Sequence, residues 1–172
     1  MTCYDSPLGR LLLCADGDGL TALRFEWQKA PWASRCADTP DGGEILIAAC
    51  RWLDEYFSGR VPEVMPPIHA DGTAFQKEVW QLLTEIPYGE TTTYGALAKT
   101  LAQRSGKTVS AQAVGGAVGH NPISVIIPCH RVVGADGSLT GYAGGIEKKL
   151  WLLRHEGAEM AALYVPKRGT AL

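Results

Sequence analysis

The chain has 172 residues and a formal net charge of −2, and apolar residues make up 46% of it while charged residues make up 20%. This length and composition are typical of a soluble globular protein with one domain or two small ones. The sequence contains no run of 18 apolar residues, and its first ten residues lack the basic-then-apolar layout of a signal peptide. We therefore expect no membrane segment and a cytoplasmic location.

The charges are unevenly distributed along the chain. Residues 1–74 contain 6 Lys and Arg against 11 Asp and Glu, a net charge of −5, and residues 75–172 contain 10 against 7, a net charge of +3. This asymmetry predicts an acidic companion domain and a mildly basic working domain. The basic excess is too small to predict a nucleic-acid partner on its own.

The cysteines do not follow the pattern of a disulfide framework or of a zinc ribbon. Their number is odd, and no two of them are spaced as C-x-x-C. We therefore expect reduced thiols and no bound metal. The five cysteines are Cys3, Cys14, Cys36, Cys50 and Cys129.

The first elements of the chain predict a small α/β domain. The stretch GRLLLCADGDGLTALRFEW places two apolar runs around an Asp-Gly-Asp-Gly turn, which is typical of a β-hairpin. Residues 28–43 are rich in Pro and Gly and predict a loop, and EILIAACRWLDEYFSG has helical spacing and a stop at Gly59. The proline-rich stretch RVPEVMPPIHADG predicts a boundary between domains over residues 1–70 and 71–172.

The second half of the chain predicts helices. Thr73 and Gln76 have the spacing of a capping box before AFQKEVWQLLTEI. TTTYGALAKTLAQR and AQAVGGAVG, with Ser110 as the cap of the latter, predict two short helices joined by a tight loop, as in a helix-turn-helix. GGIEKKLWLLRHEG predicts a last helix that stops at Gly157. The fold class expected is therefore α+β, with a mainly helical second domain.

The stretch AQAVGGAVG is almost without side chains. Such a helix is poor on propensity, and it permits close approach of its backbone to another surface. Tight packing within a core is an equally good explanation from composition alone.

The dipeptide Cys129-His130 is the candidate reactive centre. A nearby base converts a thiol into a nucleophile, but adjacent residues of an extended segment point to opposite sides, so a turn after Pro128 is needed for the two to cooperate. Glu156 is a candidate for the carboxylate that holds the imidazole, and Asn121 for a brace of the segment. The competing interpretation is that Cys129, which follows ISVII, is a small buried apolar residue.

Four motifs in a fixed order favour a reactive Cys129 over a buried apolar one. PCHRV, NP eight residues before its Cys, GYAGG and LLRHEG together resemble the O6-alkylguanine-DNA alkyltransferases, also called methylated-DNA–protein-cysteine methyltransferases, and most closely the bacterial constitutive type. The resemblance covers residues 73–157 strongly and the N-terminal half loosely. It implies a ribonuclease H-like N-terminal domain, a winged helix-turn-helix in the C-terminal domain, and no cofactor. It also implies a monomer that acts on double-stranded DNA containing O6-alkylguanine and on no membrane.

The resemblance assigns roles residue by residue. Cys129 matches the alkyl acceptor, His130 the base that acts through water, Glu156 the carboxylate that orients it, and Asn121 the residue that stabilises the turn. The extruded base would be bound by Tyr94, the carbonyls of Cys129 and Val132, and the loop residues Tyr142, Ala143 and Gly144. The positions implied to contact DNA are Ser110, Gln112, Ala113, Gly115, Gly116 and Arg131, although we favour a structural or backbone-contacting role for Arg131.

Gln112 departs from the family pattern. Well-known members carry an arginine there, which enters the base stack in place of the extruded nucleotide. Glutamine is shorter and uncharged, so we expect base flipping with a lower affinity for DNA.

The resemblance implies irreversible, single-turnover transfer of the alkyl group from O6-alkylguanine, and also from O4-alkylthymine, to Cys129. The alternatives are a non-catalytic binder of alkylated DNA, which would lack the cysteine, and a cysteine hydrolase, which would need an oxyanion hole. A methylation-responsive regulator is a third, and it would need a further domain.

Overall fold

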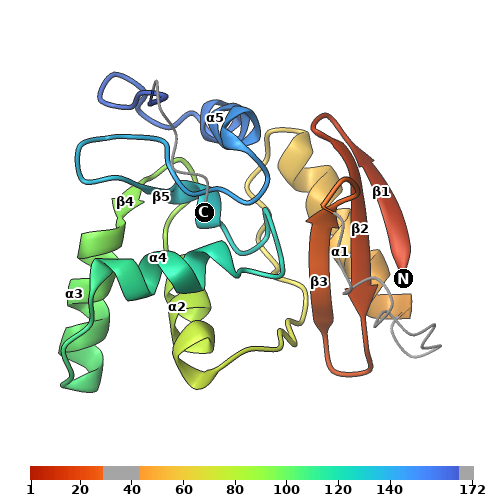
Figure 1. Ribbon diagram of the computed structural model, residues 1–172. Helices are drawn as coiled ribbons and strands as arrows, with labels where there is room; N and C mark the ends of the chain where they lie inside the picture. The colour runs from red at the N-terminus through yellow and green to blue at the C-terminus, as the bar shows by residue number, and fades with distance from the viewer. Residues whose placement is uncertain (29–42, 167–172) are drawn as a thin grey trace. The chain divides into compact units, whose positions relative to one another are not determined.

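The computed structural model describes residues 1–28 and 43–166, and the chain divides into two compact units. One unit comprises Met1–Asp71 together with Pro122–Ile126, and the other comprises Gly72–Asn121 and Ile127–Leu172. This is the mixed α+β class that the sequence predicts, and Figure 1 shows the sheet and the helices. The loop expected over residues 28–43 lies, apart from its two end residues, outside the described part of the chain.

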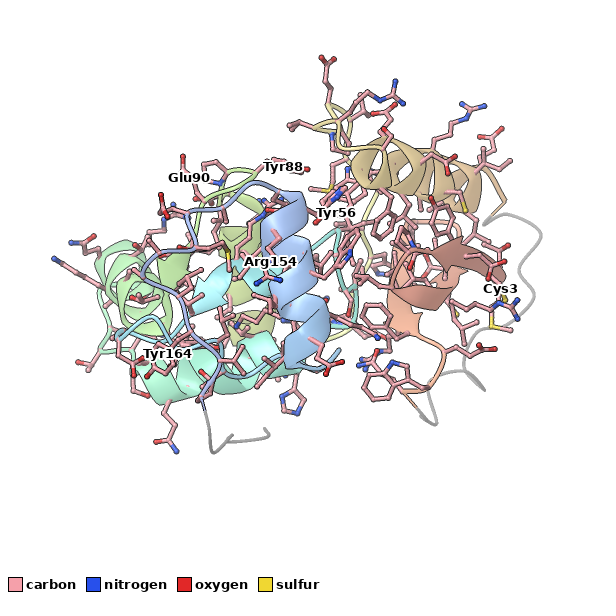
Figure 2. The ribbon with its side chains drawn as sticks, turned by 90° about the horizontal axis from the view of Figure 1, so that it is seen from above. Cys3, Tyr56, Tyr88, Glu90, Arg154 and Tyr164 are labelled. Atoms are coloured by element: carbon pink, nitrogen blue, oxygen red, sulfur yellow. The ribbon has the colours of Figure 1, made fainter. Side chains whose placement is uncertain are left out.

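The first unit is built on a three-stranded antiparallel sheet in the order β1-β2-β3, with bounds Thr2–Ser6, Gly9–Ala15 and Leu20–Phe25. The hairpin predicted around the Asp-Gly-Asp-Gly turn is confirmed, since β2 pairs with β3 in antiparallel register. Helix α1, Gly43–Phe57, packs against all three strands. Its Tyr56, labelled in Figure 2, is fully buried and stacks on Trp52 at 5.2 Å between ring centroids.

Gly19 is fixed by a close approach of the chain to itself. The amide of Leu20 donates to Pro67 O (2.8 Å) and that of His69 donates to Leu20 O (2.9 Å), which brings the segment before the second unit against β3. A Cβ atom at Gly19 would lie 2.7 Å from the backbone nitrogen of His69. A side chain at this position would therefore separate the two segments.

Residues 122–126 belong to the first unit although about fifty residues of the second unit precede them in the chain. The amide of Leu23 donates to Pro122 O (2.9 Å), and the amide of Ser124 donates to Leu23 O (2.8 Å), so the segment pairs with β3 in parallel. Val125 is fully buried with a φ of 70°, a conformation that β-branched residues rarely adopt. Its backbone is strained, two residues before the segment continues into Ile127 and Pro128.

In the described part of the second unit, α-helices lie over Ala74–Thr84 (α2), Tyr94–Ser105 (α3), Ala111–Gly119 (α4) and Ile146–His155 (α5). A parallel pair of two-residue strands, β4 (Thr92–Thr93) and β5 (Val132–Val133), joins distant parts of the sequence. The capping box of Thr73 and Gln76 is confirmed, as is the Ser110 cap of α4. Helices α2, α3 and α4 pack together, and the indole nitrogen of Trp80 donates to Ala117 O (2.8 Å) in the buried interface.

The cysteines depart from the expectation of five reduced thiols. Cys3, Cys50 and Cys129 are free thiols, whereas Cys14 is disulfide-bonded. The expectation is therefore wrong for Cys14. Within the described residues no helix combines the length and the apolar character needed to cross a membrane.

Candidate active site

Cys129 lies at the start of a short 3₁₀ helix, η3 (Cys129–Arg131), which follows Pro128 directly. The amide of Arg131 donates to Pro128 O (3.0 Å), and the amide of Val132 donates to Cys129 O. This is the turn that the sequence requires if the thiol and the imidazole are to cooperate. Both side chains are buried, with 5% of Cys129 and none of His130 exposed.

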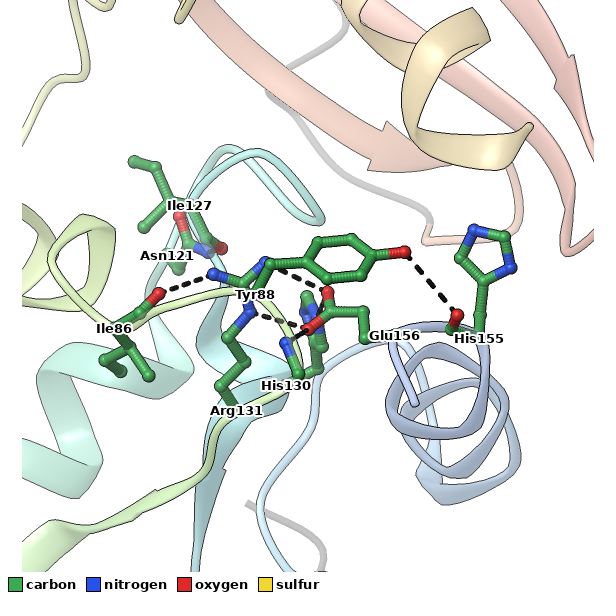
Figure 3. A network of polar contacts seen from close by, with 9 residues as sticks. Ile86, Tyr88, Asn121, Ile127, His130, Arg131, His155 and Glu156 are labelled. Carbon is green, nitrogen blue, oxygen red and sulfur yellow. Dashed lines mark hydrogen bonds and ion pairs between the residues drawn. The ribbon is translucent and has the colours of Figure 1, made fainter. Parts of the chain in front are cut away.

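Asn121 braces the thiol. Its Nδ2 atom donates to Ile127 O (2.9 Å) and to the Sγ atom of Cys129 (3.1 Å), and the carboxamide is buried (Figure 3 labels Asn121 and Ile127). One amide group therefore fixes the backbone before the cysteine and also donates to the sulfur. A donor at this distance stabilises a thiolate more than a thiol.

Glu156 forms the centre of a buried network of charged groups (Figure 3). Its Oε1 atom accepts from Nε2 of His130 (2.6 Å) and from a terminal nitrogen of Arg131 (3.0 Å). Its Oε2 atom accepts from Nε of Arg131 (2.8 Å) and from the amide of Gly89 (3.1 Å). Both oxygens are thus saturated, which is the condition under which a buried carboxylate is tolerated.

Arg131 makes further contacts within the protein. A further terminal nitrogen donates to Ile86 O (2.6 Å), and the guanidinium lies over the ring of Tyr88 at 5.7 Å from its centroid. The side chain is buried, and its donors are directed at protein acceptors. These contacts fit the structural role favoured above for Arg131, and its contact with DNA stays a prediction.

Gly89 is a site residue that sequence analysis missed. Its φ is +78°, and a Cβ atom would lie 2.7 Å from the carbonyl oxygen of Glu156. Its closeness to a carboxylate 67 residues later depends on tertiary packing, which no local sequence pattern indicates. Glycine is needed there both for the left-handed conformation and for the close approach.

The protonation states follow from these contacts. Burial alone would raise the pKa of Glu156, but the hydrogen bonds and charges of His130 and Arg131 outweigh it and lower that pKa. Burial lowers the pKa of His130, against the hydrogen bond and charge of Glu156. The imidazole is thus neutral near pH 7, and because a carboxylate only accepts, Nε2 carries the proton and Nδ1 keeps its lone pair.

Burial raises the pKa of the Cys129 thiol, against the Asn121 hydrogen bond and the charge of Lys149. The thiol therefore stays protonated until a base removes the proton. The free lone pair of His130 on the adjacent residue is suited to that role.

Lys149 is the second residue that sequence analysis missed. It is fully buried in α5, and its Nζ atom donates to Val132 O (2.5 Å) and to Thr140 O (2.6 Å). Burial lowers its pKa to about 8, against the opposite effect of Cys129, so the ammonium form prevails near pH 7 and favours a thiolate nearby. Lys149 lies three residues after Ile146 and four before Leu153, so its place on the apolar stripe of the helix was a detectable signal.

Tyr94 lies beside a cavity at the exposed side of α4. Its hydroxyl donates to Thr140 O (3.2 Å), and burial followed by the charge of Cys129 raises its pKa to about 12. The hydroxyl thus remains a donor across the physiological range. A cavity of about 320 Å³ lies beside it, lined by Tyr94, Ala111, Gln112, Gly115, Gly116, Thr140 and Gly141.

The exposed side of α4 carries glycines that internal packing does not require. Val114, Ala117 and Val118 form the buried side of the helix. A Cβ atom at Gly116 would meet nothing within 4 Å, and one at Gly115 would only touch the Tyr94 ring at 3.8 Å. Tight internal packing, the alternative that the sequence left open, therefore does not explain these two glycines.

The remaining expected residues divide between the loop and α4. Tyr142 and Gly144 are buried and Ala143 is exposed, in the loop that enters α5. Gln112 and Ala113 are exposed on α4, and the hydroxyl of Ser110 is used by the cap. Val132 keeps a carbonyl whose second lone pair remains after the bond from Lys149.

One group of possible metal ligands belongs to the first unit. Within the described ranges, Asp16, Asp18 and His69 place their ligand atoms within 4.8 Å of one another, in the first unit. Nδ1 of His69 is already paired with Asp16 Oδ2 at 2.8 Å, and two of the three side chains are exposed. The expected absence of a metal stays a prediction.

Comparisons with known proteins cover most of the chain. Residues 74–158 match the family model of the 6-O-methylguanine DNA methyltransferase DNA binding domain, and residues 1–68 match that of its ribonuclease-like domain. A Methanosarcina acetivorans methylated-DNA–protein-cysteine methyltransferase is 42% identical over 159 residues, covering 90% of this chain and 96% of its own. A Mycobacterium tuberculosis protein of the same name is 47% identical, with 88% of each chain covered.

A solved structure extends the likeness to three dimensions. The Mycobacterium tuberculosis OGT in complex with DNA has a TM-score of 0.73 and 44% identity to this chain, with 90% of each chain covered. Sequence, fold and domain order therefore agree over nearly the whole chain. The chain belongs to the 6-O-methylguanine DNA methyltransferase family.

Proposed function

We propose that this protein repairs DNA by transferring the alkyl group of O6-alkylguanine irreversibly to its own Cys129. The observation that carries this proposal is the pair of buried contacts, Asn121 with Cys129 and His130 with Glu156, on two adjacent residues. The charge of Cys129 acts on Tyr94, which lines the cavity beside α4. The alkylated oxygen of guanine lies inside the base stack, so the nucleotide must be extruded into a pocket for a protein thiol to reach it.

The transfer step uses groups that the site holds in place. The Cys129 proton passes through a water to Nδ1 of His130, and Glu156 stabilises the imidazolium that forms. The thiolate then attacks the alkyl carbon, an S–C bond forms and the C–O bond to guanine breaks. The electron pair of the broken bond stays with the purine, where a hydrogen bond from the Tyr94 hydroxyl offsets the developing charge. The product is a thioether, which no group in the site can reverse, so each molecule acts once.

DNA contact through α4 needs no reading of base edges. Its exposed residues offer backbone and small side chains to the minor groove, where shape and phosphate contacts suffice for a lesion-directed protein. Gln112 at the mouth of the cavity would hydrogen-bond the orphaned partner base. We further propose that the protein is monomeric and cytoplasmic, and that O4-alkylthymine is a second substrate.

The alternative, a non-catalytic binder of alkylated DNA, fits the same pocket and helix. It gives no role to the free thiol of Cys129 or to the base and carboxylate aligned behind it. The proposal accounts for all three groups.

The test is the intact mass of the protein after mixing with a duplex that carries O6-methylguanine. The expected result is a gain of one methyl per molecule, located on Cys129 by peptide mapping and absent from Cys129→Ser. Tight binding to the lesion without any mass gain would support the non-catalytic binder. Turnover without a stable adduct would instead indicate a hydrolase.

A further inference from the structure

Two buried polar atoms near the thiol have no hydrogen-bond partner among the described protein atoms. They are Nδ1 of His130 and the hydroxyl oxygen of Tyr142. Tyr142 comes from the loop before α5, and its ring stands perpendicular to the imidazole, with 6.4 Å between ring centroids and 84° between planes. Buried polar groups are almost always satisfied by protein or by ordered water, so two such atoms in one place call for a shared partner.

The surroundings of Tyr142 place its hydroxyl close to the reacting groups. The residue is only 8% exposed, and burial, followed by the charges of Cys129 and Glu156, raises its pKa well above the ordinary value. The hydroxyl therefore remains protonated and has a proton to donate, for which the described residues supply no acceptor. A single water can accept from one such group and donate to the other, with bonds of about 2.8 Å to each.

We propose that Tyr142 is a positioning residue which, together with Nδ1 of His130, holds the water that carries the proton from Cys129 to His130. The inference rests on the proposed function and assigns a second anchor to its relay.

The hydrogen bonds balance before and after proton transfer. At the start the water accepts from the thiol and from the Tyr142 hydroxyl and donates to Nδ1. Afterwards Nδ1 carries the proton and donates to the water, and the water donates to the thiolate while still accepting from Tyr142. The tyrosine hydroxyl thus keeps one role throughout, and by donating to the water it makes that water a better donor to the thiolate.

The substitution that tests this is Tyr142→Phe, which removes the hydroxyl and keeps the ring. Tyr164→Phe is the matched control, because Tyr164 (Figure 2) also donates its hydroxyl within the same unit, to Asp136, but is 47% exposed. The first readout is the pH dependence of carboxamidomethylation of Cys129 by iodoacetamide, followed on the peptide that contains it and without DNA. The groups that bear on this titration are His130, Arg131, Glu156, Lys149 and Tyr94, and both variants keep all of them.

The expected result is a rise of about one unit in the apparent pKa of the thiol in Tyr142→Phe and none in Tyr164→Phe. Methyl transfer from saturating DNA should slow roughly tenfold in Tyr142→Phe, with an unchanged dissociation constant for the lesion. A thermal midpoint within a few degrees of the wild-type value would show that the variant folds, since one hydrogen bond to water contributes only about 1 kcal/mol.

Three results would overturn the inference. A wild-type pH profile and transfer rate in Tyr142→Phe would mean that the hydroxyl holds nothing. Weaker lesion binding with an unchanged pH profile would mean that it contacts the base or alkyl group instead. An equal effect of Tyr164→Phe would mean a general loss of structure. Since the pH profile needs no DNA, it stands apart from the methyl-transfer assay, whose failure in the wild type would overturn the proposed function alone.

Discussion

At the scale of single residues, Glu156 holds the buried polar groups of the site in place. Its carboxylate orients His130, pairs with Arg131 and accepts from the amide of Gly89, all within a buried space. Removing one partner of a buried charge pair leaves the other unpaired, which costs more than the pair itself contributes. The sequence indicated Glu156 through its motif, and it could not indicate that Arg131 would share the same carboxylate.

We expect Glu156→Gln to lower the free energy of unfolding by about 3–5 kcal/mol, because Arg131 then keeps a buried positive charge without its partner. Urea unfolding followed by tryptophan fluorescence measures this change. Glu90→Gln, an exposed substitution of the same kind, should change stability by less than about 0.5 kcal/mol. Equal effects of the two substitutions would contradict the central role of the Glu156 network.

The same carboxylate predicts the response to acid. Its folded pKa lies below the ordinary value of 4.5, so its stabilisation is fully present above that value. The stabilisation is lost progressively as the pH falls below 4.5 towards the folded pKa. The urea midpoint of unfolding, measured at a series of pH values, should therefore fall steeply in this acidic range for the wild type. In Glu156→Gln the same midpoint should depend less on pH.

Gln112 stands where the resemblance described above implies an arginine. It is exposed and lines the mouth of the Tyr94 cavity. We expect Gln112→Arg to tighten binding to lesion-containing duplex about fivefold, since a guanidinium adds stacking and charge worth about 1 kcal/mol. Fluorescence anisotropy at fixed salt measures this, with Gln103→Arg on α3 as the control for added charge alone. A similar gain in both variants would assign the effect to charge rather than to position.

At the scale of elements, the buried side and the exposed side of α4 have different compositions. Its buried side is apolar and packs beneath Trp80, whereas its exposed side lacks side chains where internal packing would tolerate them. Local patterns sufficed to predict this helix, its Ser110 cap and the helices on either side of it. The β4–β5 pair could not be predicted, because two residues per strand give no periodicity and the partners are 40 residues apart.

Gly116→Ala should separate stability from binding. Alanine in place of glycine in a helix interior favours folding by up to about 1 kcal/mol, and here the new methyl group meets nothing within 4 Å. If α4 lies in the minor groove, the same methyl group should weaken DNA binding several-fold. Unfolding curves and anisotropy titrations on one preparation measure both effects. A gain in stability with unchanged affinity would remove Gly116 from the interface.

At the scale of the whole molecule, the first unit is discontinuous in sequence. Its sheet uses Pro122–Ile126, which pair with β3 through Leu23. The proline-rich stretch predicted a boundary near residue 70, and neither composition nor periodicity could show that the chain returns to this unit after α4. Pairing of that kind depends on tertiary structure, whereas the hairpin and the capping box are local.

This return of the chain predicts a coupling between distant positions. Ile123→Ala in the full-length protein removes a fully buried side chain and should destabilise its surroundings by about 2–4 kcal/mol. Hydrogen exchange should then accelerate in the peptide that contains β3, about a hundred residues earlier. Val133→Ala, in the core of the second unit, should accelerate exchange near α5 and spare β3. Unchanged exchange in β3 after Ile123→Ala would refute the coupling.

The discontinuity also limits how such a protein can be recombined. A crossover in the proline-rich stretch would take residues 1–71 from one parent protein. Residues 122–126, which pair with β3, would then come from the other parent. Those residues continue directly into Ile127, Pro128 and Cys129. In a chimera, the sheet from one parent must therefore pair with a segment from the other parent that leads into Cys129. Substitutions in the sheet of the first unit are thus constrained by the position of the reactive cysteine in the second.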